Sequence, residues 1–228
     1  MYVRDHMTAK PYTVNSDTVI SKAMEIMAKN HFHRLPVVDG AGKLIGLVTG
    51  GVIEEGSGAK STSLSIFELN YLLSKTKVSD LMLTDVKTAS ADEFVEEAAQ
   101  RMIDNGIAAL PVVDADNVVI GIITEKDIFQ AFSELLGHKS LGTRFIISCE
   151  DKPGFVVGVA KCFADNDCNI ETMAVYHSKE RGTELVVKAT GEISAPDMAK
   201  IMTGKGYDLK GVAQTLKDGS VRQYPVEA

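Results

Sequence analysis

The feature that most constrains the fold of this chain is an internal repeat. Residues 35–53 (LPVVDGAGKLIGLVTGGVI) align without a gap on residues 110–128 (LPVVDADNVVIGIITEKDI), at a spacing of 75 residues. Extended backwards, the same register gives 17 identities over the 51 aligned positions 3–53 and 78–128. A repeat of this kind is one supersecondary unit that cannot bury its apolar face alone. The sequence therefore predicts two similar small units packed together.

Each repeat shows the spacing of a strand, a helix, a hairpin and a second helix. Asn15 and Ser90 are predicted N-caps, and Ser90 forms a capping box with Glu93. The apolar residues that follow recur at spacings of three and four, which predicts a helix with one apolar face. Two β-branched runs at residues 35–38 and 44–48 flank a glycine-containing turn and predict the hairpin.

The segment between the repeats reads as a polar loop at residues 54–63, followed by a helix at residues 66–74 with Ser65 as its cap. We expect this helix to cover part of the tandem core, and a partner-binding helix is the alternative. After residue 137 the predicted order of elements is strand, helix, strand, strand, helix, strand, which is the ferredoxin-like plan. Residues 217–228 form a tail without a usable signal.

Composition narrows the class of protein. The net charge is 24 − 31 = −7 with no basic run, which disfavours binding to nucleic acid or anionic lipid. No apolar run approaches the roughly 20 residues of a membrane span, and the first ten residues lack a signal peptide's apolar stretch. We therefore expect a cytoplasmic protein. The three cysteines are expected to be free thiols, and a redox pair of Cys162 with Cys168 is the alternative.

The paired LPVVD and GIITEKDI segments, with a DLM segment at the start of the second repeat, resemble the CBS domain in the tandem arrangement called a Bateman module, over residues 1 to about 138. The DKPGF turn at residues 151–155, followed by Asn169 and Ile170, resembles the ACT domain over about residues 141–213. The resemblance implies an α/β (α+β) protein, a tandem CBS pair with a C-terminal ferredoxin-like ACT domain. With SLSIFELNYLL between the repeats, the order is similar to the acetoin-utilisation AcuB-like CBS-ACT proteins of bacteria. The expected boundaries are 1–60, first CBS domain; 61–77, linker helix; 78–138, second CBS domain; 139–216, ACT domain; 217–228, tail.

The resemblance implies an adenosyl ligand between the repeats, held by the start and the pre-PVV residues of one repeat and the T-x-x-D of the other. An Asp carboxylate can accept from both ribose hydroxyls, and a Thr hydroxyl and free helix amides suit a phosphate. The alternative is that Thr124 and Asp127 only cap a helix. The expected complete nucleotide site is Thr13, His33, Arg34, Thr124, Lys126 and Asp127.

The second copy of this site is expected to be degenerate. Where repeat two has Asp127, repeat one has Val52, which offers no acceptor to a ribose. This weaker site would comprise Thr49, Val52, Thr88 and Ala108.

In the ACT region the resemblance implies an amino-acid site. Gly154 leaves backbone amides uncovered at a helix start, where a ligand carboxylate is attracted. Asn169 could hold the ligand ammonium, and Phe155 could fill the pocket. The alternative is a turn that only shapes the chain in a dimerisation element. The expected amino-acid-binding residues are Asp151, Gly154, Phe155, Asn169 and Ile170.

The function expected from the sequence is regulatory. The chain has no G-x-S-x-G, P-loop or H-E-x-x-H motif, so we expect no catalytic residues and no catalytic cofactor. His31 and His33 lack further ligands at a suitable spacing, so no metal site is expected. The expected ligand is an adenine nucleotide such as AMP or ATP, or S-adenosylmethionine. A homodimer acting on an unknown regulated protein is implied by the resemblance. The alternatives are a structural module with vestigial ligand sites and an unrecognised enzyme of acetoin catabolism.

Overall fold

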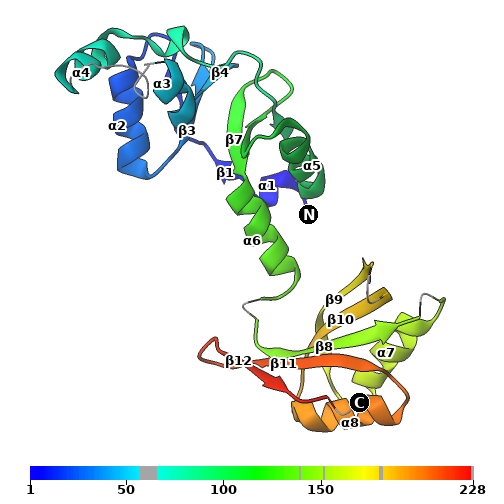
Figure 1. Cartoon of the computed structure of the whole chain (residues 1–228). Coiled ribbons are helices and arrows are strands. Elements are labelled where there is room, and N and C mark those ends of the chain that lie inside the picture. Colours follow the sequence, from blue (N-terminus) through cyan, green and yellow to red (C-terminus); the bar gives the residue numbers. More distant parts are fainter. Residues whose placement is uncertain (57–65, 139, 151, 180–181, 227–228) are drawn as a thin grey trace. The chain divides into compact units, whose positions relative to one another are not determined.

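A computed structural model describes residues 1–56, 66–138, 140–150, 152–179 and 182–226. The chain divides into two compact units, Met1–Ala131 and Phe132–Ala228. Helices and strands interleave in both units (Figure 1). The mixed α/β fold class predicted from the sequence is confirmed.

The first repeat folds as the spacing of its apolar residues predicts. Its strands β2, β3 and β4 form one sheet, in which β2 runs parallel and β4 antiparallel to β3. The apolar face of α2 packs on this sheet through Ile20, Ala23 and Met27, all buried. The elements are β2 (Val14–Asn15), α2 (Ile20–Asn30), β3 (Arg34–Val38), β4 (Leu44–Thr49) and α3 (Gly50–Gly56).

The second repeat has the same plan. Its sheet has the order β1-β7-β6-β5, with β5 parallel and β7 antiparallel to β6. Val95, Ala98 and Met102 bury the apolar face of its first helix. The elements are β5 (Ala89–Ser90), α5 (Val95–Asn105), β6 (Ala109–Val113), β7 (Val119–Thr124) and α6 (Glu125–Leu135).

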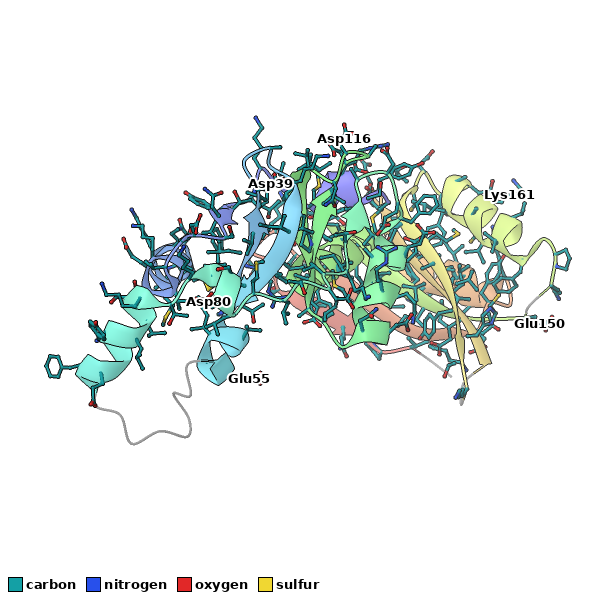
Figure 2. All side chains as sticks on the ribbon, turned by 90° about the horizontal axis from the view of Figure 1, so that it is seen from above. Asp39, Glu55, Asp80, Asp116, Glu150 and Lys161 are labelled. Atoms are coloured by element: carbon teal, nitrogen blue, oxygen red, sulfur yellow. The ribbon has the colours of Figure 1, made fainter. Side chains whose placement is uncertain are left out.

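The two hairpin turns meet each other. Gly42 and its aligned counterpart Asn117 both have positive φ, 81° and 64°, a conformation that glycine and asparagine adopt most readily. Asp39 stabilises the first turn by accepting from the backbone N–H groups of Ala41 and Lys43 at 2.9 Å each. Backbone hydrogen bonds link the turns, from Leu44 N to Asn117 O and from Val119 N to Gly42 O. Figure 2 shows Asp39 and Asp116 on these neighbouring turns.

The first residues of each repeat pack on the other repeat. The segment containing α1 (Val3–His6) and β1 (Thr8–Ala9) pairs with β7. Val3, fully buried, joins the core of the second repeat. Conversely, the segment beginning with the 3₁₀ helix η1 (Val78–Asp80) places Val78 in the core of the first repeat.

Residues 3–9 and 78–87, which pack on the other repeat, are called the crossing segments. An aligned glycine in each sheet leaves room for them. A Cβ on Gly46 would lie 2.9 Å from the backbone oxygen of Leu83 and 2.6 Å from Met82 Sδ, so this position requires glycine. A Cβ on Gly121 would meet the side chain of Met7. The crossing segments are thus fixed by burial of one valine and by close packing of one methionine on each side.

The predicted helix starts are wrong by about one turn. The N-cap residues are Val19 and Phe94, whereas Asn15 and Ser90 end the short strands β2 and β5. Ser90 Oγ accepts from Asp92 N at 3.3 Å, so this side chain stabilises a turn before the helix. The capping-box partner is Glu97, which accepts from Phe94 N at 3.0 Å.

The segment between the repeats is partly helical. Helix α3 continues to Gly56, so the predicted loop does not begin at residue 54. Residues 57–63 and the predicted cap Ser65 lie outside the described residues. The predicted linker helix is confirmed as α4 (Ile66–Lys75). It buries Leu73 in the first core, while Phe67 is 85% exposed, so it covers that core over part of its length.

The second unit has the predicted βαββαβ order. Its sheet is antiparallel throughout, with the strand order β12-β11-β8-β10-β9. Phe145, Ile147 and Leu185 form a core with the buried faces of the two helices. The elements are β8 (Gly142–Cys149), α7 (Phe155–Ala164), β9 (Asn169–Ser178), β10 (Gly182–Thr190), α8 (Ala195–Gly204), β11 (Leu209–Thr215) and β12 (Val221–Tyr224).

The tail, in which the sequence shows no usable signal, contains a strand. Residues Val221–Tyr224 form β12, which pairs with β11 as an edge strand of the sheet. Tyr224 Oη donates to Gln214 Oε1 at 2.7 Å.

Cys149, Cys162 and Cys168 are not joined by disulfide bonds in the structure. Burial raises the pKa of the Cys168 thiol, and the charge of Asp167 adds to this effect. None of the helices among the described residues is long and apolar enough to span a bilayer.

Candidate functional site

A cavity of about 470 Å³ lies between the two repeats in the first unit. We call it the inter-repeat cavity. The first repeat contributes the start of β3, the end of β4 and the first turn of α3. The second repeat contributes residues 85–87 and the start of β6. The residues used below are His33, Arg34, Thr49, Glu54, Lys87 and Ala108.

Arg34 is the most informative side chain of the inter-repeat cavity. It is the first residue of β3 and lies opposite Thr49 in the hairpin register. Burial lowers the pKa of its guanidinium, and attraction to Glu125 opposes this shift. The guanidinium of Arg34 makes no hydrogen bond or ion pair with a residue that the structure describes. A half-buried guanidinium without a partner suits a phosphate or carboxylate, which it can bind through two parallel hydrogen bonds.

The beginning of α3 leaves space beside this guanidinium. Gly50 N donates to His33 O at 3.0 Å, which ties the helix start to the strand entry. A Cβ added to Gly50 or Gly51 would meet no atom closer than 3.9 Å, outside its own immediate chain neighbours. The hydroxyl of Thr49 accepts from Val52 N at 3.2 Å. Here the helix start is capped by Thr49, and no carboxylate stands at position 52.

The corresponding start of α6 has a fuller cap. Asp127 Oδ2 accepts from Thr124 N at 2.8 Å and from Thr124 Oγ1 at 2.7 Å. Asp127 N donates back to Thr124 Oγ1 at 3.4 Å. Glu125 N donates to Ala108 O, which repeats the tie seen in the first repeat. The capping arrangement considered from the sequence is therefore present, and Oδ1 makes no hydrogen bond to a described residue.

The remaining predicted nucleotide residues are spread over both repeats. His33 and Arg34 line the inter-repeat cavity together with Thr49 and Ala108, so residues assigned to two different sites share one cavity. Thr88 lines a separate hollow beside Arg101 and Asp114. The other members lie as follows: Thr13 is exposed before β2, Lys126 is exposed in the first turn of α6, and Val52 is half-buried in α3.

Sequence reasoning missed Glu54 and Lys87 as lining residues. Lys87 Nζ lies 3.1 Å from Asp85 Oδ1, so its charge is partly balanced at the cavity. Lys87 could have been found from the sequence, because the 75-residue spacing aligns Thr88 with Thr13 and Lys87 directly precedes Thr88. No comparable signal marks Glu54.

The repeat register places aromatic side chains where the inter-repeat cavity has aliphatic or charged ones. Lys87 aligns with Tyr12 and Ile107 aligns with Phe32. The rings of Tyr12 and Phe32 are in contact, with centroids 5.5 Å apart and planes inclined by 51°. Both are partly exposed, at 56% and 37%. The positions that correspond to Lys87 and Ile107 in the first repeat therefore carry a partly exposed pair of aromatic rings.

The predicted amino-acid site lies around the turn that leads into α7. Gly154 has φ of 90°, which favours glycine, and directly precedes the helix. A hollow of about 630 Å³ is lined by Gly154, Phe155, Lys205 and Tyr207 among others. The rings of Phe155 and Tyr207 meet edge to face, with centroids 5.9 Å apart. Asp151 lies outside the described residues.

The structure does not bring Asn169 and Ile170 to this turn. In the sheet register Ile170 and Thr143 both pair with Ala189, whereas Cys149, which precedes the turn, pairs with Thr183. Six residues of strand separate the two levels, which is about 20 Å at roughly 3.3 Å per residue. Within one chain the two halves of the predicted amino-acid site therefore lie at opposite ends of the sheet.

No group of three or more His, Cys, Asp or Glu side chains among the described residues is arranged to hold a metal ion.

Comparison with known families gives two matches. The CBS domain matches residues 3–51 and 78–134, and the ACT domain matches residues 143–203. Among curated proteins, homoserine O-acetyltransferase of Methanohalobium evestigatum is 34% identical over 133 residues, which is 58% of this chain and 24% of that protein. The chain thus spans about a quarter of the length of the curated relatives it matches.

Three solved structures resemble the CBS region. The CBS domain pair of protein MJ0100, in complex with 5′-methylthioadenosine and S-adenosyl-L-methionine, is 31% identical with a TM-score of 0.50, over 59% of this chain and 97% of that one. CBSX2 in complex with AMP is 30% identical with a TM-score of 0.51, over 59% and 97%. A putative acetoin utilization protein, AcuB, from Vibrio cholerae is 28% identical with a TM-score of 0.51, over 60% and 93%.

Proposed function

We propose that this chain, which belongs to the CBS domain family and carries an ACT domain after its CBS pair, is a regulatory protein that senses an adenosyl compound. The similar CBS pairs of MJ0100 and CBSX2 hold methylthioadenosine, S-adenosylmethionine or AMP. The observation that carries the proposal is Arg34 on the wall of the inter-repeat cavity, whose half-buried guanidinium makes no hydrogen bond or ion pair with a described residue. Its mechanism is linkage, in which bound ligand shifts the population of the arrangement that a partner protein reads.

The proposed complete site comprises Thr13, His33, Arg34, Thr124, Lys126 and Asp127, with the ribose on the free Oδ1 of Asp127. In this assignment Tyr12 and Phe32 add an aromatic surface for the adenine ring, since bases stack on aromatic side chains. The weaker position is proposed to comprise Thr49, Val52, Thr88 and Ala108, of which Thr49 and Ala108 lie in the same cavity as Arg34. The proposal therefore expects about one tightly bound ligand per chain.

Calorimetry with AMP, ATP, S-adenosylmethionine and methylthioadenosine tests this assignment. Loss of a hydrogen bond to a charged group costs about 1.5–3 kcal/mol, so Asp127→Ala should weaken binding roughly 10- to 100-fold. Val52→Asp should strengthen the weaker position, because it supplies the missing acceptor. Unchanged affinity of Asp127→Ala, or two equal sites per wild-type chain, would count against it.

The ACT domain is proposed to bind an amino acid only when two copies associate. Gly154 and Asn169 lie at opposite ends of one sheet, so a ligand that contacts both needs the turn of one chain and the strand start of another. This supports the proposed homodimer. Amide NMR shifts of Gly154, Phe155 and Asn169 in the full chain, recorded against the twenty amino acids, test the idea together with the dimer mass. If no amino acid moves these signals at millimolar concentration, the domain is a dimerisation element.

The proposed setting is the cytoplasm and acetoin utilisation, supported by the likeness to the Vibrio cholerae protein. We propose a regulatory role and not an enzymatic one, because the longer acetyltransferase relatives are matched over only about a quarter of their length. Turnover of acetoin by the purified chain would overturn this part of the proposal.

A further inference from the structure

A second cavity, of about 410 Å³, opens in the C-terminal unit. Its walls are the first residues of β8, the last residues of β10 and β11, and the first turns of α8. We call it the β8 cavity. It lies at the other end of the sheet from the turn before α7, since Ala189 pairs with Thr143 at one end and Thr183 with Cys149 at the other. It is therefore separate from the hollow at that turn, and lies at the end of the sheet where Asn169 and Ile170 begin β9.

The inner wall of the β8 cavity is apolar. Phe145 is 2% exposed and Met198 1% exposed, and both belong to the main core of the unit. The chain cannot fill the space from Gly142, because its φ is 125° and a Cβ there would lie 2.7 Å from Ala189 O. A recess lined in this way favours an aliphatic group over water.

Two hydrogen-bond donors face each other on this apolar side. Thr143 is 8% exposed and alternates with the buried Phe145 and Ile147, so it lies on the core face of β8. Its hydroxyl makes no hydrogen bond to a described residue. Gln214 pairs with Thr143 in the register, and its Oε1 is occupied by Tyr224 Oη. The amide N–H groups of Gln214 therefore remain beside the free hydroxyl.

The charge at the mouth of the β8 cavity is positive. Lys217 lines the rim, is exposed, and forms no ion pair with a described residue. The residues that line the cavity include no Asp or Glu. The other hydroxyls there are already engaged, since Thr190 donates to Glu171 and Thr215 accepts from Lys188. The open groups are thus two donors and one ammonium, and the carboxylate in contact with the lining, that of Glu171, already accepts from Thr190 and Asn169.

We propose that the β8 cavity binds a small aliphatic monocarboxylate. The carboxylate accepts from Thr143 and Gln214 and faces Lys217, and the aliphatic tail lies on Phe145 and Met198. A chain of about four to six carbon atoms suits a cavity at the lower end of the usual size range of ligand pockets. A 2-amino acid is a poorer fit, because its ammonium would be desolvated without a carboxylate partner.

The test uses the full-length protein and pentanoate as the probe. Methyl NMR of the methionines should show a saturable shift of Met198 in the millimolar range, and calorimetry should give the same affinity. Thr143→Val keeps the shape but removes the hydroxyl, and should weaken pentanoate roughly 10-fold. Lys217→Gln should weaken it a few-fold and abolish its dependence on salt. Lys210→Gln, which removes an exposed charge of β11 that pairs with Asp208, is the matched control and should bind normally.

Each result decides the proposal. An unmoved Met198 methyl at high millimolar pentanoate would overturn it, as would equal affinity of wild type and Thr143→Val. Equal binding of 2-aminopentanoate would overturn the choice of ligand class. If Thr143→Val fails to give the wild-type methyl spectrum, Lys217→Gln carries the test alone, because an exposed side chain can be exchanged without disturbing the core.

Discussion

Replacing Arg34 by methionine should separate adenosyl ligands that carry a phosphate from those that do not. Methionine keeps the apolar stem of arginine and removes its charge. At about 4 Å and an effective dielectric constant of about 20, two unit charges attract by ~4 kcal/mol. Desolvation of the phosphate offsets part of this, and Arg34 is only half-buried, so water screens it further. We therefore expect a loss near the lower end of the range for charged hydrogen bonds, about 1.5 kcal/mol.

This loss corresponds to roughly 10-fold weaker AMP binding. Methylthioadenosine has no phosphate, so its affinity should stay within about 2-fold of wild type. Calorimetry of both ligands on wild type, Arg34→Met and the exposed control Lys29→Met measures the difference. An equal loss for AMP and methylthioadenosine would refute the reasoning, because it would mean that the substitution deforms the cavity and does not remove a phosphate contact.

Two further predictions concern the crossing segments. Val78→Ala should cost about 2–3 kcal/mol of stability, because methyl groups are lost and a cavity is left behind, and amide hydrogen exchange should accelerate in residues 35–48 of the first repeat. Val3→Ala should instead accelerate amide hydrogen exchange in residues 110–123 of the second repeat. Acceleration confined to each valine's own repeat would contradict the packing of each segment on the other repeat. The hydrogen bond from Lys77 lowers the pKa of Asp17, so the stability from this pair is present above the carboxyl's unfolded pKa and is lost as the pH falls through its folded value; carboxyl NMR titration should show this lowered pKa in wild type and an ordinary one in Lys77→Gln.

The repeat explains why the packing of each crossing segment on the other repeat could not be predicted. Val3 and Val78 occupy equivalent positions, as do Met7 and Met82. An apolar residue in the sequence is expected to be buried. Because the two repeats have similar cores, the sequence does not show in which core the residue is buried. Sequence spacing therefore predicted α2, α5 and both hairpins, which depend on residues close in the chain, and left open which copy receives each crossing segment.

Two other differences between the predicted and the observed elements have local causes. Asn15 and Ser90 are good helix caps and equally good turn residues. The turn forms here because the buried apolar faces of the helices begin only at Ile20 and Val95, five residues later. Strand β12 is a short edge strand whose first three residues are exposed, so it lacks an apolar alternation that could reveal it.

The candidate sites show the same limit at longer range. A family resemblance groups Gly154 with Asn169, but only the strand register shows that they lie at opposite ends of the sheet. Likewise, Arg34 could be predicted as an anion-binding residue from its chemistry, whereas the sequence could not show that it shares a cavity with Thr49 and Ala108.

One crossing segment also connects the wall of the inter-repeat cavity to the cores of both repeats. In residues 78–87, Val78 lies in the core of the first repeat and Met82 packs against Gly46. Leu83 then pairs with Leu47, and Lys87 lines the cavity. Leu83 and Leu47 exchange two backbone hydrogen bonds of 2.9 Å, which tie this segment to the first repeat just before residues 85–87. A ligand that moves the cavity wall must therefore act on the packing of the first repeat, although the segment continues directly into β5 of the second. For the proposed sensor, this continuity means that a bound ligand biases both repeats at once.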